Sequence, residues 1–98
     1  TPHRDPKSSH VFHQYTMKVC GFDRFELQEF LSTKDIPAMV YYPVALHMQT
    51  AYKDERYPEG HFPTTEELCQ CVISLPMHSE LSDEQLKYIT DAVLEFIG

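Results

Sequence analysis

Apolar and polar residues alternate along residues 10–19, and this period of two predicts a first β-strand. One face of the strand would carry Val11, His13, Tyr15, Met17 and Val19. Because that face is mostly apolar, we expect it to cover the core of the domain. His13 is the polar exception on it, and Gln14 would lie on the opposite face.

The pattern then changes to apolar residues three and four positions apart, which indicates an amphipathic helix. Its buried stripe would consist of Leu27, Phe30 and Leu31. The helix is predicted to begin at Asp23, whose side chain can cap the first turn while Glu26 reaches back. It fades at residues 32–33.

Two further helices are predicted by capping pairs of the same kind. The second would begin at Thr64, paired with Glu67, carry Leu68, Val72 and Ile73 inward, and close before Pro76. The third would begin at Ser82, paired with Gln85. Its apolar stripe would consist of Leu86, Ile89, Val93, Phe96 and Ile97.

Residues 36–49 combine a short apolar run with an unusual group of polar side chains. Residues 38–40 predict a buried strand, which Pro43 ends because proline has no N–H to donate to a ladder. The neutral hydrogen-bonding groups that follow are Tyr41, Tyr42, His47 and Gln49. Such groups suit a polyhydroxylated ligand. In the alternative, the tyrosines are core aromatics and His47 is a packed loop histidine, which on spacing alone is the commoner outcome.

These elements predict one small domain of the α+β two-layer class, in which three helices pack on a small antiparallel or mixed sheet. The domain would cover residues 10–98. Residues 1–9 are polar, contain two prolines and show no period, so they are predicted to be a tail or linker. Because the chain begins at Thr1 and not at Met, we expect that an upstream segment has been cut away.

Charge and composition exclude several classes of partner. A net charge of −7 argues against non-specific binding to nucleic acid or to anionic membranes, and no apolar run is long enough to span a bilayer. Three cysteines are an odd number and too sparse for a disulfide framework, so we expect reduced thiols and a cytoplasmic location. The six histidines show no zinc-type spacing with cysteine or carboxylate, which predicts no metal site.

The residue types needed for covalent catalysis are missing from the chain. No Gly-x-Ser-x-Gly elbow occurs, and the three glycines, at positions 21, 60 and 98, cannot form a phosphate-binding loop. Glu66 and Glu67 lie in a first helical turn, where the helix dipole explains them. The lysines fall in tails, exposed faces or loops. The domain therefore has groups for binding, and we assign it no catalytic residue.

Several segments, in this order, resemble one family. They are Val11-Phe12-His13-Gln14-Tyr15-Thr16, Ile36-Pro37, Tyr41-Tyr42-Pro43-x-x-Leu46-His47-x-Gln49, Tyr52, Phe62-Pro63, Ser74-Leu75-Pro76-Met77-His78 and Leu81-Ser82-x-Glu84-Gln85. Together they are similar to the C-terminal domain of the DegT/StrS family of nucleotide-sugar aminotransferases. The resemblance covers about residues 10–96, nearly the whole chain beyond the tail.

The resemblance implies the small C-terminal domain of a fold-type I aminotransferase. Members of the family are homodimers that carry pyridoxal phosphate on a lysine and move an amino group, usually from glutamate, to a ketone of a nucleotide sugar. The motifs Gln14-Tyr15-Thr16 and Tyr41-Tyr42-Pro43 are most similar to those of enzymes that aminate a 3-keto nucleotide sugar for surface-polysaccharide synthesis. The cofactor-binding residues belong to a large domain that would precede Thr1, so we expect this chain alone to bind no cofactor and to be inactive.

The resemblance also suggests which residues contact substrate. Tyr42 and His47 match positions near the bound sugar nucleotide, and Tyr41 and Gln49 are lesser candidates. His13 and Gln14 match a strand position at the same cleft, although for these two and Tyr41 a structural role stays favoured. The alternative hypothesis is a free-standing module that binds sugar nucleotides or another protein without catalysis.

Overall fold

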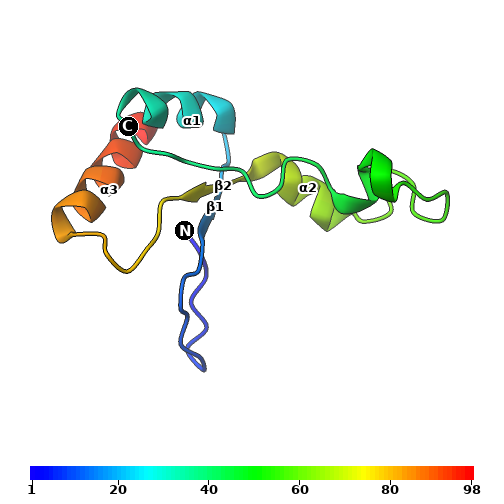
Figure 1. Cartoon of the computed structure of the whole chain (residues 1–98), viewed down its shortest axis with the longest axis horizontal. Helices are drawn as coiled ribbons and strands as arrows, with labels where there is room; N and C mark the ends of the chain where they lie inside the picture. Colours follow the sequence, from blue (N-terminus) through cyan, green and yellow to red (C-terminus); the bar gives the residue numbers. More distant parts are fainter.

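Two short strands and three α-helices form the fold (Figure 1), in a computed structural model that describes all residues 1–98. In chain order the elements are β1 (Tyr15–Lys18), α1 (Arg24–Thr33), the 3₁₀ turns η1 (Leu46–Met48) and η2 (Thr50–Tyr52), α2 (Pro63–Cys71), β2 (Val72–Leu75) and α3 (Asp83–Ile97). No helix has the length and apolar composition that a membrane crossing requires. The three cysteines are free thiols.

The sheet consists of β1 and β2, which pair antiparallel with Tyr15 opposite Leu75 and Lys18 opposite Val72. On its other edge, β2 accepts one more partner. The backbone groups of Met39 and Ser74 exchange hydrogen bonds of 2.9 and 2.7 Å, which form an isolated antiparallel bridge. The predicted fold class, a small antiparallel sheet with three helices, is confirmed.

The core lies where α1 and α3 meet the sheet. Leu27, Leu31 and Ile73 are the largest fully buried side chains, and Ile89 and Val93 of α3 complete the centre. At its edge the rings of Phe22 and Phe96 meet edge to face at 5.2 Å. The apolar stripe predicted for α1 therefore faces the core. Of the stripe predicted for α3, Ile89, Val93 and Phe96 do so, whereas Leu86 and Ile97 are 40% and 57% exposed.

The first strand is shorter than predicted. Only residues 15–18 of the expected 10–19 pair, and Val11 is 89% exposed. The reason lies in the partner strand, since β2 ends at Leu75 and the next residue is Pro76, which has no N–H to extend the ladder. His13 and Gln14 consequently lie in a bend before β1, and both are exposed.

The second helix was predicted with wrong ends. It begins at Pro63 with Phe62 as an N-cap that makes no side-chain hydrogen bond, and it ends at Cys71. The next residues, expected to continue the helix, form β2, because the β-branched pair Val72–Ile73 fits a buried strand. The strand predicted over residues 38–40 is likewise reduced to the single bridge at Met39.

The predicted capping pairs formed to different extents. Ser82 and Gln85 make both hydrogen bonds of a capping box at the start of α3. At the start of α1, Asp23 accepts from the Phe25 N–H at 2.8 Å, and no return bond from Glu26 forms. In α2, Thr64 lies inside the first turn and does not cap it.

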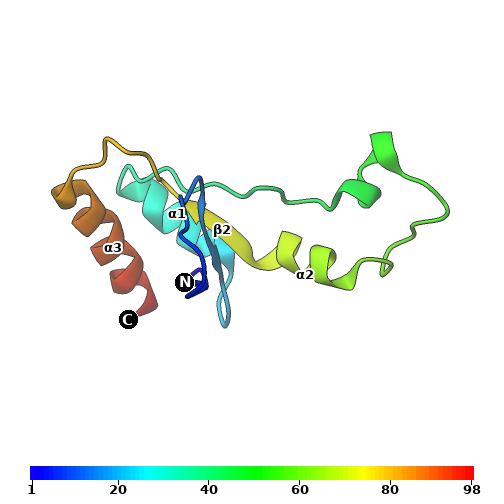
Figure 2. The same cartoon turned by 90° about the horizontal axis from the view of Figure 1, so that it is seen from below.

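Residues 43–71, which we call the arm, project away from the sheet and return to it through α2 (Figures 1 and 2). The molecule is accordingly elongated, with extents of 49 × 35 × 24 Å and a radius of gyration of 15.8 Å. A compact domain of this length would have a radius of gyration of about 13 Å. Part of the chain therefore lies outside the packed core.

Candidate functional site

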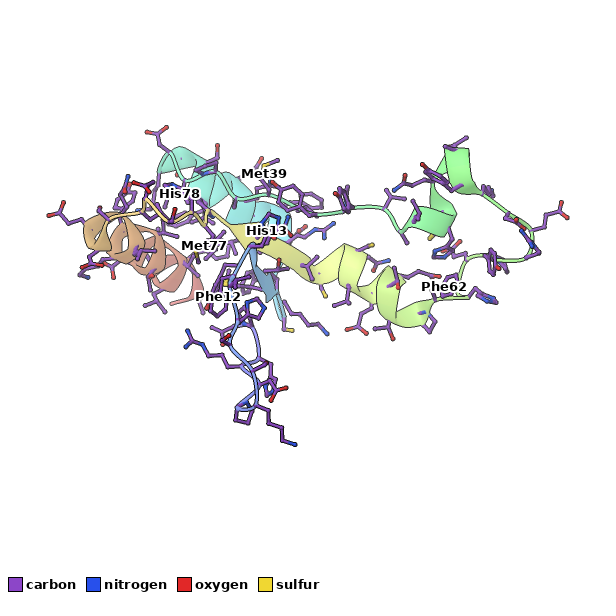
Figure 3. The ribbon with its side chains drawn as sticks, turned by 60° about the horizontal axis from the view of Figure 1, so that its bottom comes forward. Phe12, His13, Met39, Phe62, Met77 and His78 are labelled. Atoms are coloured by element: carbon purple, nitrogen blue, oxygen red, sulfur yellow. The ribbon has the colours of Figure 1, made fainter.

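A cleft of about 540 Å³ lies at the end of the sheet where β1 begins and β2 ends. Four of the predicted site residues line it, namely His13, Gln14, Tyr41 and Tyr42. The other lining residues are Pro37, Met39, Ser74, Leu75, Pro76, Met77 and His78. Figure 3 shows His13, Met39, Met77 and His78 gathered at this end of the sheet, far from Phe62 in the arm.

Strand register explains why these distant residues meet. Tyr15 pairs with Leu75 in an antiparallel ladder, so His13, two residues earlier, comes opposite Met77, two residues later. On the other edge of β2, the Met39–Ser74 bridge fixes the backbone just before Tyr41. The cleft is thus formed where residues 13–14 and residues 37–42 meet the end of β2 from its two edges.

The cleft offers neutral polar groups and ring faces. Tyr41 and Tyr42 are 41% and 71% exposed, and their rings lie edge to face at 6.0 Å. The alternative in which these tyrosines are core aromatics is therefore wrong. No aspartate, glutamate, lysine or arginine lines the cleft, and the Ser74 hydroxyl is hydrogen-bonded to Thr16 Oγ1 at 2.8 Å. This donor set suits hydroxyl-rich or aromatic ligands and provides no activated nucleophile.

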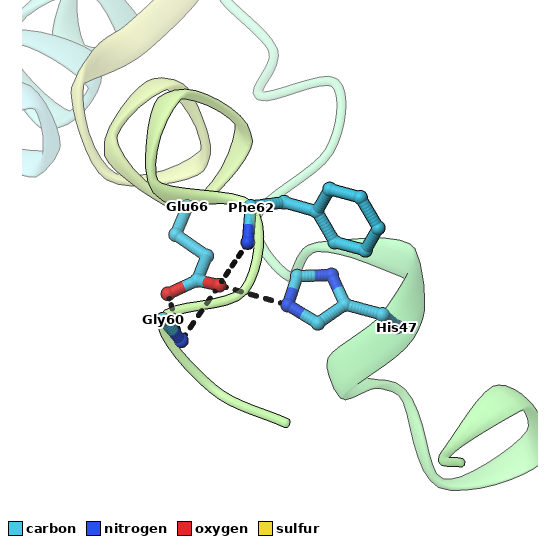
Figure 4. A network of polar contacts seen from close by, with 4 residues as sticks. All are labelled: His47, Gly60, Phe62 and Glu66. Atoms are coloured by element: carbon cyan, nitrogen blue, oxygen red, sulfur yellow. Dashed lines mark hydrogen bonds and ion pairs between the residues drawn. The ribbon is translucent and has the colours of Figure 1, made fainter. Parts of the chain in front are cut away.

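The other two predicted residues, His47 and Gln49, lie in the arm and not in the cleft. The His47 side chain is only 8% exposed, and its Nε2 lies 2.9 Å from Glu66 Oε1 (Figure 4). Its ring packs edge to face on Phe62 at 5.0 Å. Gln49 donates through Nε2 to the Val44 carbonyl oxygen at 3.2 Å. Both side chains therefore join parts of the arm to each other, His47 to Glu66 of α2 and Gln49 to Val44.

Glu66 is the centre of that network, and the sequence pattern did not single it out as such. Its two carboxylate oxygens each accept from the Gly60 N–H at 2.9 Å, and Oε1 also accepts from Phe62 N–H at 3.3 Å. Partial burial opposes ionisation, but these N–H groups and His47 prevail and lower the pKa of Glu66 below its usual value. The carboxylate therefore ties the loop before α2 to η1.

Acid should weaken this network. Because the native pKa of Glu66 is lowered, its stabilising effect is complete above the ordinary value of 4.5 and is lost as pH falls through the native pKa. We expect Glu66→Gln to lower the melting temperature at pH 6–7 and to converge with the parent toward pH 3, as melting curves would show. Glu55→Gln, an exposed arm glutamate without such partners, is the matched control. A difference between parent and Glu66→Gln that is independent of pH would contradict the assignment.

Comparison with known proteins gives consistent findings over nearly the whole chain. The sequence pattern of the DegT/DnrJ/EryC1/StrS aminotransferase family matches residues 1–94. A pleiotropic regulatory protein of Geobacillus stearothermophilus is 42% identical over 96 residues, which are 98% of this chain and 25% of that protein. The dTDP-3-amino-3,4,6-trideoxy-alpha-D-glucose transaminase of Streptomyces venezuelae is 34% identical over 91 residues, 93% of this chain and 24% of its own length.

Among solved structures, the chain is similar to S. venezuelae DesV in complex with a ketimine intermediate. The TM-score is 0.87 at 34% identity, and the match covers 97% of this chain and 25% of DesV. The chain therefore spans about a quarter of the length of the relatives that it matches.

Proposed function

The chain belongs to the DegT/DnrJ/EryC1/StrS aminotransferase family, and on this premise we propose that it is the C-terminal small domain of an aminotransferase acting on a keto nucleotide sugar. The enzyme is a homodimer that uses pyridoxal phosphate and takes the amino group from glutamate. Its product is a 3-amino sugar for a surface polysaccharide. Residues 10–98 form the small domain, and residues 1–9 lead in from the large domain.

The single observation that carries this proposal is the cleft at the end of the sheet. It presents phenol, imidazole and amide groups to one open space and has no aspartate, glutamate, lysine or arginine in its lining. Such groups bind sugar hydroxyls and nucleotide bases by hydrogen bonds and stacking. They need take no part in the amino transfer itself. The length covered by the match supports the same proposal, because three quarters of each relative lies outside it.

The residues of this chain do not fit pyridoxal phosphate. A Schiff-base lysine needs a desolvated amine, whereas Lys18, Lys34 and Lys87 are paired with carboxylates at 2.6–2.9 Å. Lys7 and Lys53 are exposed. We therefore place the cofactor on the large domain and give the small domain the task of binding and orienting the sugar nucleotide.

Within the cleft, the proposed substrate contacts are Tyr42 and Tyr41, which present hydroxyls and ring faces, together with His13 and Gln14. His47 and Gln49 contribute by holding the arm, which continues directly from Tyr42. Free movement of the arm would move the Tyr41–Tyr42 wall as well. In this proposal the small domain thus supplies one pre-formed wall of the substrate site.

We expect Tyr42→Phe in the full-length enzyme to raise KM for the nucleotide sugar about 3–10-fold, with kcat nearly unchanged. This is the effect of removing one neutral hydrogen bond made in both ground and transition states. Steady-state kinetics of the amino transfer measures it, and the cofactor absorbance should stay that of the parent. Tyr52→Phe is the matched control, because Tyr52 is exposed in the arm and does not line the cleft.

Two results would contradict the proposal. The first is full-length protein that binds the cofactor and turns over no nucleotide sugar. The second is micromolar binding of a nucleotide sugar by residues 1–98 alone, which would favour the free-standing binding module. A wall of a shared site should instead bind such ligands weakly when it is isolated.

A further inference from the structure

The last helix, α3, is apolar over a wider arc than its packing in the core requires. At about 100° per residue, its apolar side chains from Ala92 round to Leu94 cover roughly 200° of the helix surface. One half of this arc is buried and contains Ile89, Ala92 and Val93. The other half contains Leu86, Leu94 and Ile97, which are 40%, 60% and 57% exposed.

The exposed half of the arc forms one wall of a groove of about 550 Å³ between α3 and the sheet. The opposite wall comes from β1, with Tyr15 and Met17, and from Leu75 and Met77 at the end of β2. Thirteen of the seventeen lining residues are hydrophobic, and the one charged side chain among them is Lys18. The groove thus differs in chemistry from the polar cleft, which it adjoins at Leu75, Pro76 and Met77.

The start of the chain lies at this groove. Thr1 is one of its lining residues, together with Ile97 of α3. Figure 2 shows the N-terminus of the chain close to the C-terminal end of α3. A residue advances the chain by at most about 3.5 Å, so a residue that directly precedes Thr1 would lie in or beside the groove. The relatives that match this chain are about four times as long, and the proposed function places a large domain before Thr1.

We propose that the segment directly preceding Thr1 occupies this groove and buries apolar side chains against Leu86, Leu94 and Ile97. This inference rests on the proposed function only in that the chain continues before Thr1. The preceding segment is favoured over a second copy because it is tethered at the groove itself, so its effective concentration there is high. A docked segment would also explain the width of the apolar arc on α3.

Photo-crosslinking of the full-length protein tests the proposal. With Leu94→p-benzoylphenylalanine, irradiation should give an intramolecular adduct whose tryptic map joins residue 94 to the segment directly before Thr1. The matched control is Tyr88→p-benzoylphenylalanine, on the opposite side of α3, where the tyrosine hydroxyl donates to the Lys34 carbonyl at 3.2 Å. No adduct with the preceding segment is expected there. Ile97→p-benzoylphenylalanine serves as a second position in case the first variant does not fold.

Each other outcome overturns the inference. An adduct between two chains would place a second copy in the groove, and an adduct with a distant part of the same chain would place another surface there. If neither position 94 nor position 97 gave an adduct, the groove would be open to solvent in the full-length protein. Aminotransferase activity of the unmodified protein is measured separately. An active enzyme without the adduct refutes this inference alone, and the adduct in an inactive protein refutes the proposed function alone.

Discussion

Leu31→Ala is expected to lower the free energy of unfolding of the chain by about 2–5 kcal/mol. Leu31 has no exposed surface and lies among the buried residues of α1, β2 and α3. Its truncation removes apolar contacts and leaves a cavity. The cavity cannot close fully, because α1 is packed against both β2 and α3. Small domains have total stabilities of about 5–15 kcal/mol, so the loss is a large fraction of the whole. Urea unfolding followed by circular dichroism at 222 nm measures it.

The control for this prediction is Leu94→Ala in the same 98-residue chain. Both leucines are helical, so the difference in helix propensity on changing to alanine is the same and cancels. Leu94 is 60% exposed, and its truncation should change the free energy of unfolding by less than about 0.5 kcal/mol. Equal losses at the two positions would mean that the core is not centred where α1 meets β2 and α3.

The parts of the fold that the sequence predicted are those decided by neighbouring residues. The α3 helix is an example, because the Ser82–Gln85 capping box and the spacing of Ile89 and Val93 are properties of one continuous segment. The helix α1 was predicted for the same reason. At α2 the capping pattern gave the wrong start, because the helix begins at Pro63 after Phe62, which makes no side-chain cap bond.

The second strand was missed because its identity depends on a partner far away in the chain. Val72 and Ile73 continue the apolar spacing of α2, so local periodicity places them in the helix. What makes them a strand is pairing with β1, in which Lys18 lies opposite Val72 and Met17 lies opposite Ile73. The β-branched pair was the one local signal for the strand.

The candidate site was predicted in the same uneven way. His13, Gln14, Tyr41 and Tyr42 line one cleft, whereas His47 and Gln49, which the family resemblance grouped with them, lie in the arm. The roles of all six toward a ligand are a proposal. His78 was not singled out, because the segment that carries it was interpreted as the end of a helix. Glu66 was explained by the helix dipole, and nothing local indicated that it also accepts from His47, nineteen residues earlier.

The second large effect is expected at Arg24, the first residue of α1 and a charged side chain that is only 6% exposed. Its Nη1 donates to the carbonyl oxygens of Cys69 at 2.5 Å and of Val72 at 3.2 Å, where α2 ends and β2 begins. The guanidinium also lies 5.0 Å from the centre of the Phe25 ring. Arg24 thus joins α1 to the base of the arm. Its positive charge also lies at the C-terminus of α2, where the helix dipole favours a cation.

Two opposing terms decide what Arg24→Met does, since methionine keeps the apolar stem and removes the donors. Buried Nε of Arg24 has no partner, and relief of that unpaired group favours the variant by about 1–3 kcal/mol. Against this, two carbonyl oxygens lose hydrogen bonds to a charged donor, each worth about 1.5–3 kcal/mol. The second term is the larger, so we expect a net loss of about 2 kcal/mol in the free energy of unfolding, measured by urea denaturation.

Hydrogen exchange distinguishes this from a general loss of stability. If Arg24 holds the base of the arm, Arg24→Met should speed amide exchange in residues 63–71 more than in residues 83–97 of α3, because its hydrogen bonds go to Cys69 and Val72. The control is Arg56→Met, because Arg56 is an exposed arm residue paired with Asp54, and its replacement should leave both the stability and the exchange pattern unchanged. If Arg24→Met were at least as stable as the parent, relief of the unpaired Nε would offset the loss of both carbonyl bonds, and Arg24 would not hold the base of the arm.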